Sequence, residues 1–284
     1  MTTLSVESCS RELRRTRGAR VDLAFRMRGT GPAIVLLHGT SASHAVWEPV
    51  SLALATEATV ISLDQRGHGR SDKPTTGYAG TDFAGDVLTV LDALDIERAI
   101  IGGHSLGARN AWLVGALHPD RVDGVLTVDY TPYVEADVLD VLRVRVAAGD
   151  RPFESVAEIE SYLHERYPRM PPEAVARRAA AGYERVGTGH DGIPSWRALA
   201  APAAMDKLIA GFRTPWDAEF AAVAAPMTQV RGADSGIVSE ASWQSALAAR
   251  PQDRAIVDPD ADHYVPEENP DLIVAELRQL LTNT

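Results

Sequence analysis

The chain has 284 residues, which is enough for one large α/β domain or two small ones. Hydrophobic residues make up 45 % of it, an ordinary share for a soluble globular protein, and the formal net charge of −11 argues against a nucleic-acid partner. One cysteine, Cys9, excludes an intramolecular disulfide, and no apolar run approaches the length of a membrane span. We therefore expect a cytoplasmic protein that does not bind membranes.

The first twenty residues contain five arginines and no apolar core, so they do not form a secretory signal. We expect this arm to be mobile or to cover an edge of the fold. No internal repeat or low-complexity tract follows it.

Short apolar runs predict buried strands, and apolar residues that recur at helical spacing predict helices. The predicted strands are residues 21–27, 33–37, 59–63, 99–102, 124–128, 226–232 and 254–257. The predicted helices are residues 46–55, 81–94, 108–117, 243–249 and about 270–281. Strands that alternate with helices indicate an α/β fold with a mostly parallel sheet covered on both faces, and ligands at the carboxyl ends of its strands.

The alternation stops after Pro132. From residue 134 to about 216 no run is typical of a strand, and helical segments such as 155–167 and 173–183 are separated by prolines. We interpret residues 134–216 as a helical lid over the carboxyl edge of the sheet. The core would then consist of residues 1–133 and 217–284.

One segment has the sequence pattern of a nucleophile elbow, a sharp turn that carries a reactive serine. Gly103-His104-Ser105-Leu106-Gly107 fits G-x-S-x-G, and it lies between a predicted strand and a predicted helix. A serine on such a sharp turn has a strained backbone, and its flanking glycines avoid a clash between the two sides of the turn. The pattern predicts that Ser105 stands at the amino end of a helix, where negative charge is favoured.

Three further motifs accompany this turn: His38-Gly39-Thr40 after an early strand, the loop from Asp64 to Ser71 with its Arg66-Gly67 pair, and His263 before the final helix. With them, the chain resembles the α/β-hydrolase superfamily, in particular its lidded serine hydrolases such as esterases, lactonases and C–C bond hydrolases. The resemblance covers nearly all of the chain from about residue 21.

The resemblance implies a role for several residues. Ser105 would be the nucleophile, and the backbone N–H groups of Thr40 and Leu106 would bind the oxyanion. The chain order of this family places the base after the nucleophile, and His263 is the one histidine there that follows the last strand. No metal or cofactor is implied.

Two residues are candidates for the acid that orients the histidine. In much of the family it is the third residue past the glycine of the 226–232 strand, but that residue is Ser235 here, and Asp234 is one position short. A second arrangement in the family places the acid after the 124–128 strand, where Asp129 stands. We favour Asp129 and keep Asp234 as the alternative.

The resulting prediction is a cofactor-free serine hydrolase that cleaves a carboxylic ester or lactone of a small apolar molecule. The alternatives are a hydrolase of C–C bonds in diketones, a ligand-sensing protein and a non-hydrolytic catalyst on the same scaffold. A small molecule is the expected partner, and a homodimer is left open. The aromatic residues expected to line the pocket are Trp47, Tyr130, Tyr133, Trp216 and Tyr264.

Overall fold

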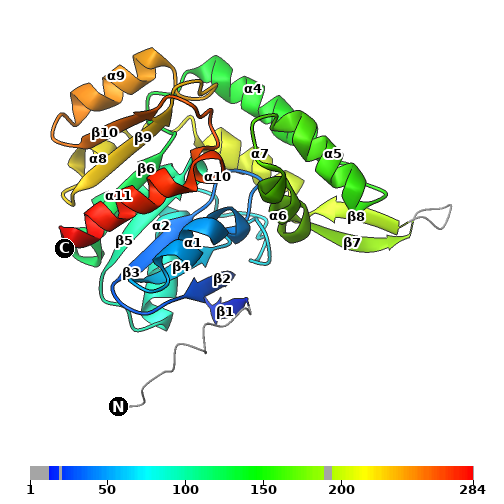
Figure 1. Cartoon of the computed structure of the whole chain (residues 1–284), viewed down its shortest axis with the longest axis horizontal. Helices are drawn as coiled ribbons and strands as arrows, with labels where there is room; N and C mark the ends of the chain where they lie inside the picture. Colours follow the sequence, from blue (N-terminus) through cyan, green and yellow to red (C-terminus); the bar gives the residue numbers. More distant parts are fainter. Residues whose placement is uncertain (1–12, 19–20, 189–193, 284) are drawn as a thin grey trace.

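The computed structural model describes residues 13–18, 21–188 and 194–283. An eight-stranded sheet lies at its centre, with the strand order β1-β2-β4-β3-β5-β6-β9-β10 (Figure 1). β1 and β2 are antiparallel to their neighbours, and the other six strands, β4, β3, β5, β6, β9 and β10, are parallel to one another. The strands are β1 (Arg14–Arg17), β2 (Asp22–Arg28), β3 (Ala33–Leu37), β4 (Thr59–Leu63), β5 (Ala99–His104), β6 (Val122–Val128), β9 (Met227–Gly232) and β10 (Arg254–Asp258).

Helices cover both faces of this sheet, as predicted. One apolar cluster joins the sheet to α1 (Glu48–Leu54) and α11 (Pro270–Thr282). A larger cluster on the other face includes α2 (Gly80–Ala93), α3 (Leu106–Leu117), α8 (Asp217–Ala222) and α9 (Glu240–Ala249). The fold is therefore an α/β-hydrolase fold with a mostly parallel sheet.

The described part of the amino-terminal arm forms the strand at one edge of the sheet. β1 pairs with β2 in antiparallel register, from Arg14 opposite Phe25 to Arg17 opposite Asp22. This segment thus covers an edge, one of the two possibilities that the sequence suggested. Residues 1–12 and 19–20 lie outside the described residues.

The segment between β6 and β9, residues 134–216, is called the insertion below. Its described residues form four helices and, contrary to the prediction, a two-stranded antiparallel hairpin. Its elements are α4 (Ala136–Ala147), α5 (Val156–Arg166), α6 (Pro172–Gly182), β7 (Tyr183–Thr188), β8 (Pro194–Ala198) and α7 (Pro202–Gly211). The hairpin has no continuous apolar run because much of it is exposed, so nothing in the sequence pattern marked it as a strand pair.

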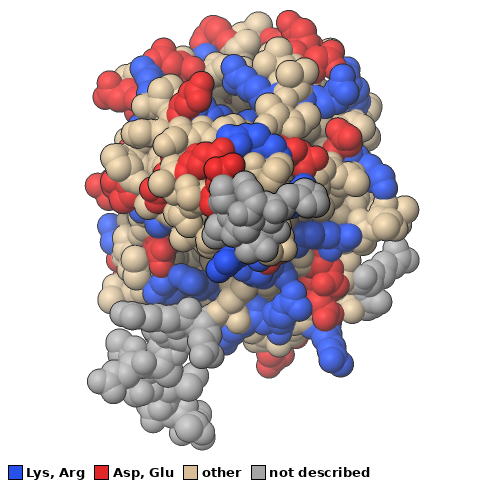
Figure 2. Space-filling model, turned by 90° about the vertical axis from the view of Figure 1, so that its right-hand side faces the viewer, with Lys and Arg blue, Asp and Glu red and all other residues tan. Residues whose placement is uncertain are grey.

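The insertion packs in two different ways. Leu139 of α4 and Leu208 of α7 belong to the apolar core beside the sheet, whereas α5 and α6 share a separate cluster around Ile159 and Leu163. In Figure 1 the hairpin and α6 extend away from the sheet, and positive and negative side chains are interspersed on the face viewed from that side (Figure 2).

Contacts of the insertion lie on loops that follow the carboxyl ends of strands. Ala201 N donates to Gly67 O at 3.0 Å, and Arg70 pairs with Glu184 at 2.7 Å; both core residues follow β4. Glu267, which accepts from Arg178 of α6, follows β10. The insertion therefore lies at the edge of the sheet where ligands bind in this class of fold. None of the described helices has the length and apolar character that a membrane span requires.

Candidate active site

Ser105 lies on a strained turn between β5 and α3. Its φ of 53° and ψ of −116° place it outside the regions that non-glycine residues normally adopt. Its N–H donates to Val128 O at 2.8 Å, which fixes the turn to the end of β6. A strained, buried serine at the amino end of a helix is the geometry that the G-x-S-x-G pattern predicted.

The two glycines of this turn are required by space. A Cβ on Gly103 would lie 2.0 Å from Gly107 O, and a Cβ on Gly107 would lie 2.0 Å from Leu37 O. Both contacts are with backbone atoms, which cannot rotate away as a side chain could.

Gly103→Ala should therefore lower the free energy of unfolding by roughly 3 kcal/mol, because overpacking forces the backbone to shift. Gly85→Ala is the matched control, since Gly85 is exposed on α2 and a Cβ there meets no atom within 4 Å. It should raise that free energy by about 1 kcal/mol through helix propensity. Chemical denaturation of both variants measures the difference, and equal values would contradict the steric explanation.

His263 meets Asp129, and not Asp234, in the structure. The His263 Nδ1 and Asp129 Oδ2 atoms are 3.2 Å apart, and the Asp129 side chain is fully buried. Asp129 N donates to Val230 O at 2.8 Å, which holds the residue at the end of β6. The Asp234 side chain is 59 % exposed and pairs with Arg169 at 2.7 Å instead.

Ser235 supports Asp129, a role that the sequence analysis missed. Burial raises the pKa of Asp129, while the hydrogen bond with His263 and the side chain of Ser235 act to lower it. Asp129 Oδ1 has no hydrogen-bond partner among the described residues, so the Ser235 side chain acts on the pKa of Asp129 without a hydrogen bond to this oxygen. That hydroxyl accepts from the N–H groups of Ile237 and Val238, so its hydrogen is free for the carboxylate. Ser235, the position where the resemblance would place the acid in much of the family, therefore lies near Asp129 in this structure.

His104 holds the backbone of His263. The His104 Nε2 and His263 O atoms are 2.7 Å apart, and the two ring centroids are 4.7 Å apart. Burial, with the nearby His263 ring, lowers the pKa of His104 well below its usual value. The ring therefore stays neutral and donates its Nε2 hydrogen to the carbonyl.

The expected oxyanion donors adjoin Ser105. Leu106 is the first residue of α3, and Thr40 follows Gly39, where a Cβ would lie 3.3 Å from the Ser105 Cβ. Within residues 13–18, 21–188 and 194–283, neither the Thr40 N–H nor the Leu106 N–H has a hydrogen-bond acceptor. Two free backbone donors beside a buried serine hydroxyl are suited to binding an oxyanion.

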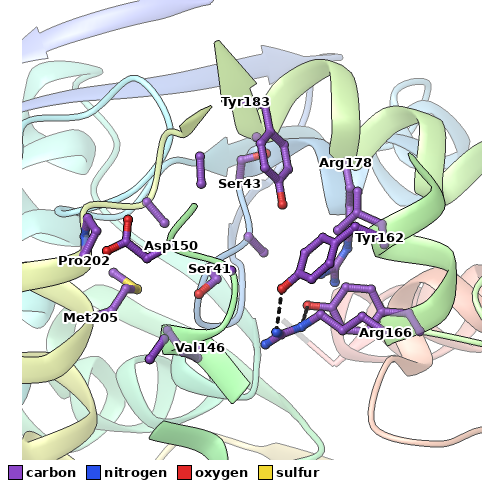
Figure 3. Close-up of a pocket in the computed structure, with 18 of the residues that line it drawn as sticks. Ser41, Ser43, Val146, Asp150, Tyr162, Arg166, Arg178, Tyr183, Pro202 and Met205 are labelled. Atoms are coloured by element: carbon purple, nitrogen blue, oxygen red, sulfur yellow. Dashed lines mark hydrogen bonds between the residues drawn. The ribbon is translucent and has the colours of Figure 1, made fainter. Parts of the chain in front are cut away.

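Two cavities adjoin this site and share one wall, made of Tyr162, Arg166 and Tyr167. The first is lined by Ser41 and Ser43, next to Thr40, and by side chains of the insertion (Figure 3). The second is lined by His263 and Tyr264.

Arg166 lies in the shared wall. It donates from Nε to the Tyr167 hydroxyl at 2.8 Å and from Nη1 to the Tyr162 hydroxyl at 2.9 Å (Figure 3). Its Nη2 makes no hydrogen bond with a described residue.

Of the five aromatic residues expected in the pocket wall, only Tyr264 lines either cavity. Trp47 is fully buried in the cluster with α1 and α11, where it directly precedes α1. Tyr130 stacks on the Trp112 ring at 5.7 Å, and Tyr133 and Trp216 pack against the same core. Apolar patterning alone cannot distinguish these packing roles from a pocket wall.

Among the described residues, no group of three or more His, Cys, Asp and Glu side chains is arranged to hold a metal ion.

Comparisons with known proteins agree with this architecture. A family model described as alpha/beta hydrolase fold matches residues 32–270. The chain is 39 % identical over 268 residues to a 2-(acetamidomethylene)succinate hydrolase from Mesorhizobium japonicum, which covers 94 % of each chain.

Among solved structures, that of an E-2-(acetamidomethylene)succinate hydrolase has a TM-score of 0.91 at 39 % identity and covers 95 % of this chain and 99 % of the other. An enol-lactonase from Burkholderia xenovorans has a TM-score of 0.73 at 21 % identity, covering 95 % of this chain and all of the other, and this likeness concerns the fold alone. The chain therefore belongs to the α/β-hydrolase fold family and is a hydrolase.

Proposed function

We propose that the chain is a serine hydrolase with Ser105 as nucleophile, His263 as base and Asp129 as the acid that orients the base. The contact between His263 Nδ1 and Asp129 Oδ2, beside the strained Ser105, carries this proposal. With Nδ1 held by the carboxylate, His263 Nε2 is left to take the Ser105 proton. Asp129 then stabilises the imidazolium that forms, and the N–H groups of Thr40 and Leu106 receive the oxyanion.

The proposed substrate is 2-(acetamidomethylene)succinate or a closely related unsaturated dicarboxylate. The support is the similarity over 94 % of both chains to an enzyme named for that substrate. Such a compound is neither an ester nor a lactone. The relatives therefore support the alternative of a C–C bond hydrolase better than the predicted hydrolase of an ester or lactone. The compound is also anionic, whereas the sequence led us to expect a small apolar molecule.

The chemistry of that compound fits a serine nucleophile. Ser105 Oγ bonds to the acetyl carbonyl carbon, the C–N bond breaks, and His263 returns its proton to the leaving nitrogen. Water then attacks the acetyl-enzyme and releases acetate. A second water converts the remaining enamine to an aldehyde and ammonia, and the carboxylate β to that aldehyde can leave as carbon dioxide, which breaks a C–C bond. These steps need no cofactor.

Arg166 is our candidate for binding a substrate carboxylate. It lines both cavities, and its Nη2 is free, as described above. The guanidinium stays charged because the Tyr167, Tyr162 and Tyr264 side chains raise its pKa against the effect of burial. Planar guanidinium groups bind carboxylates with strong, directional hydrogen bonds.

Arg166→Met should therefore raise KM by roughly ten- to a hundredfold, the loss expected for a hydrogen bond to a charged group. Arg143→Met is the matched control, because Arg143 is exposed on α4 and lines neither cavity. Steady-state kinetics on the dicarboxylate measure both variants, with thermal melting to check that each is folded. An unchanged KM in Arg166→Met would assign carboxylate binding to other groups.

We also propose that the insertion acts as a lid over the site, since both cavities are walled by its side chains. Limited proteolysis should cut within residues 134–216, or at its borders, sooner than in the sheet. A bound substrate analogue should slow that cutting. Protection confined to the amino-terminal arm would contradict the lid.

Acetate release from 2-(acetamidomethylene)succinate by the purified protein tests the proposed substrate. The diester of the same compound and an aryl acetate serve as comparison substrates that lack the two carboxylates. We expect multiple turnovers, with a higher kcat/KM for the dicarboxylate than for either comparison. Faster turnover of the aryl acetate would favour the esterase that the sequence predicted, and a single slow turnover would favour a ligand sensor.

A further inference from the structure

We propose that Arg178 is a positioning residue: it fastens the insertion to the loop that carries His263 and so holds the base in place. This inference rests on the proposed function, because it takes His263 to be the catalytic base. Arg178 lies on α6, whereas His263 lies between β10 and α10 (Val265–Glu268), some 85 residues later in the chain.

The fastening is a buried ion pair. Arg178 Nε donates to Glu267 Oε1 at 3.0 Å and to Oε2 at 2.9 Å, and Arg178 Nη2 also donates to Oε2. The two side chains are 7 % and 2 % exposed, which sets this pair apart from the exposed pair between Arg70 and Glu184. Both pairs join the insertion to the core, but only the buried one is shielded from water and salt.

Two tyrosines complete the contact. The Arg178 guanidinium lies 4.8 Å from the Tyr167 ring centroid and 5.1 Å from the Tyr264 ring centroid. The two rings meet edge to face at 4.5 Å. Tyr167 follows α5 and Tyr264 is the neighbour of His263, so each ring comes from one of the two segments that the ion pair joins.

The connection from this cluster to His263 is short. Glu267 N donates to Tyr264 O at 2.9 Å, which makes Tyr264 and Glu267 parts of the same helical turn. The His263 ring lies 5.0 Å from the Tyr264 ring, and His104 holds the His263 carbonyl from the side of the sheet. In addition to the contact between its ring and Asp129, His263 is thus held by His104 of the core and, through Tyr264 and Glu267, by Arg178 of the insertion.

Fully buried ion pairs add little net stability, and an apolar pair of similar size often replaces them without loss. Their directional hydrogen bonds do fix geometry. Arg178 remains charged throughout the working pH range, because Glu267 and the two tyrosines raise its pKa although burial acts against this. A permanent, directional contact at this place is suited to holding an imidazole within reach of Ser105.

The test measures the rate at which a small fluorophosphonate labels Ser105, since that reaction needs the base but no substrate pocket. Arg178→Met and Glu267→Gln should each slow labelling and reduce kcat roughly 100-fold, the effect of a displaced catalytic group. Arg178→Lys should recover part of the loss. Arg70→Met, which removes an exposed pair between the insertion and the core, should leave both rates unchanged.

A double variant separates positioning from stability. Arg178→Met with Glu267→Met replaces the pair by apolar groups and should recover the melting temperature of the wild type, but not the labelling rate. Recovery of both would overturn the proposal, since only stability would then matter. Arg178 lines the first cavity, whereas Glu267 lines neither cavity. A reduced kcat in Arg178→Met but not in Glu267→Gln would therefore also overturn the proposal, because Arg178 would then act on the ligand directly. Absence of labelling in the wild type would instead reject the proposed nucleophile.

Discussion

Ser105→Ala should reduce turnover by roughly four or more orders of magnitude while the melting temperature stays near that of the wild type. The reason is that the alanine has no oxygen to attack the carbonyl, while the strained turn is held by the backbone bond from Ser105 N to Val128 O and by its two glycines. Initial rates measured with a sensitive acetate assay give the size of the loss.

His263→Ala should cause a loss of about the same size, and the double variant should be little worse than either single one. Residues that act as one unit are not additive, since removing the base leaves a serine that cannot be activated. If the two losses multiply instead, the two side chains do not work as a pair.

Asp129→Asn should cost up to about 10⁴-fold in turnover. Asparagine keeps the shape of the side chain, but it cannot stabilise an imidazolium, and its amide favours the wrong histidine tautomer. The carboxylate is fully buried against His263, so no solvent can replace its charge.

Asp234→Asn is the matched control for Asp129→Asn. Asp234 lies in the later loop, exposed and paired with Arg169 at 2.7 Å, so its loss should leave most of the turnover. The pH dependence of kcat/KM for both variants gives a second reading of the same question. A severe loss in Asp234→Asn together with a mild one in Asp129→Asn would move the acid to the loop after β9.

The regular part of the fold could be predicted from the sequence because its patterns are local. Residues 33–37 and 59–63 are continuous apolar runs, and they are β3 and β4 in the structure with those same bounds. The turn at Ser105 could also be recognised, because only glycine fits where two backbone segments leave no room for a Cβ atom between them.

The remainder depends on tertiary contacts that no local pattern encodes. Whether a tryptophan such as Trp47 faces a cavity or the interior depends on which side chains pack around it in the folded chain. The ion pair between Arg178 and Glu267 joins residues 89 positions apart in the chain, and neither residue belongs to a recognisable sequence motif. The proximity of Ser235 to Asp129 likewise arises only once β6 and β9 are neighbours in the sheet.

The most direct test of a Ser105 nucleophile is labelling of the wild-type protein with a fluorophosphonate, followed by digestion and mass mapping of the modified peptide. The reagent bonds covalently to an activated serine hydroxyl, so it reports the nucleophile independently of the natural substrate. We expect one modified residue, Ser105, with loss of turnover in proportion to labelling. Modification of another residue, or no modification of protein that turns over substrate, would contradict the assignment.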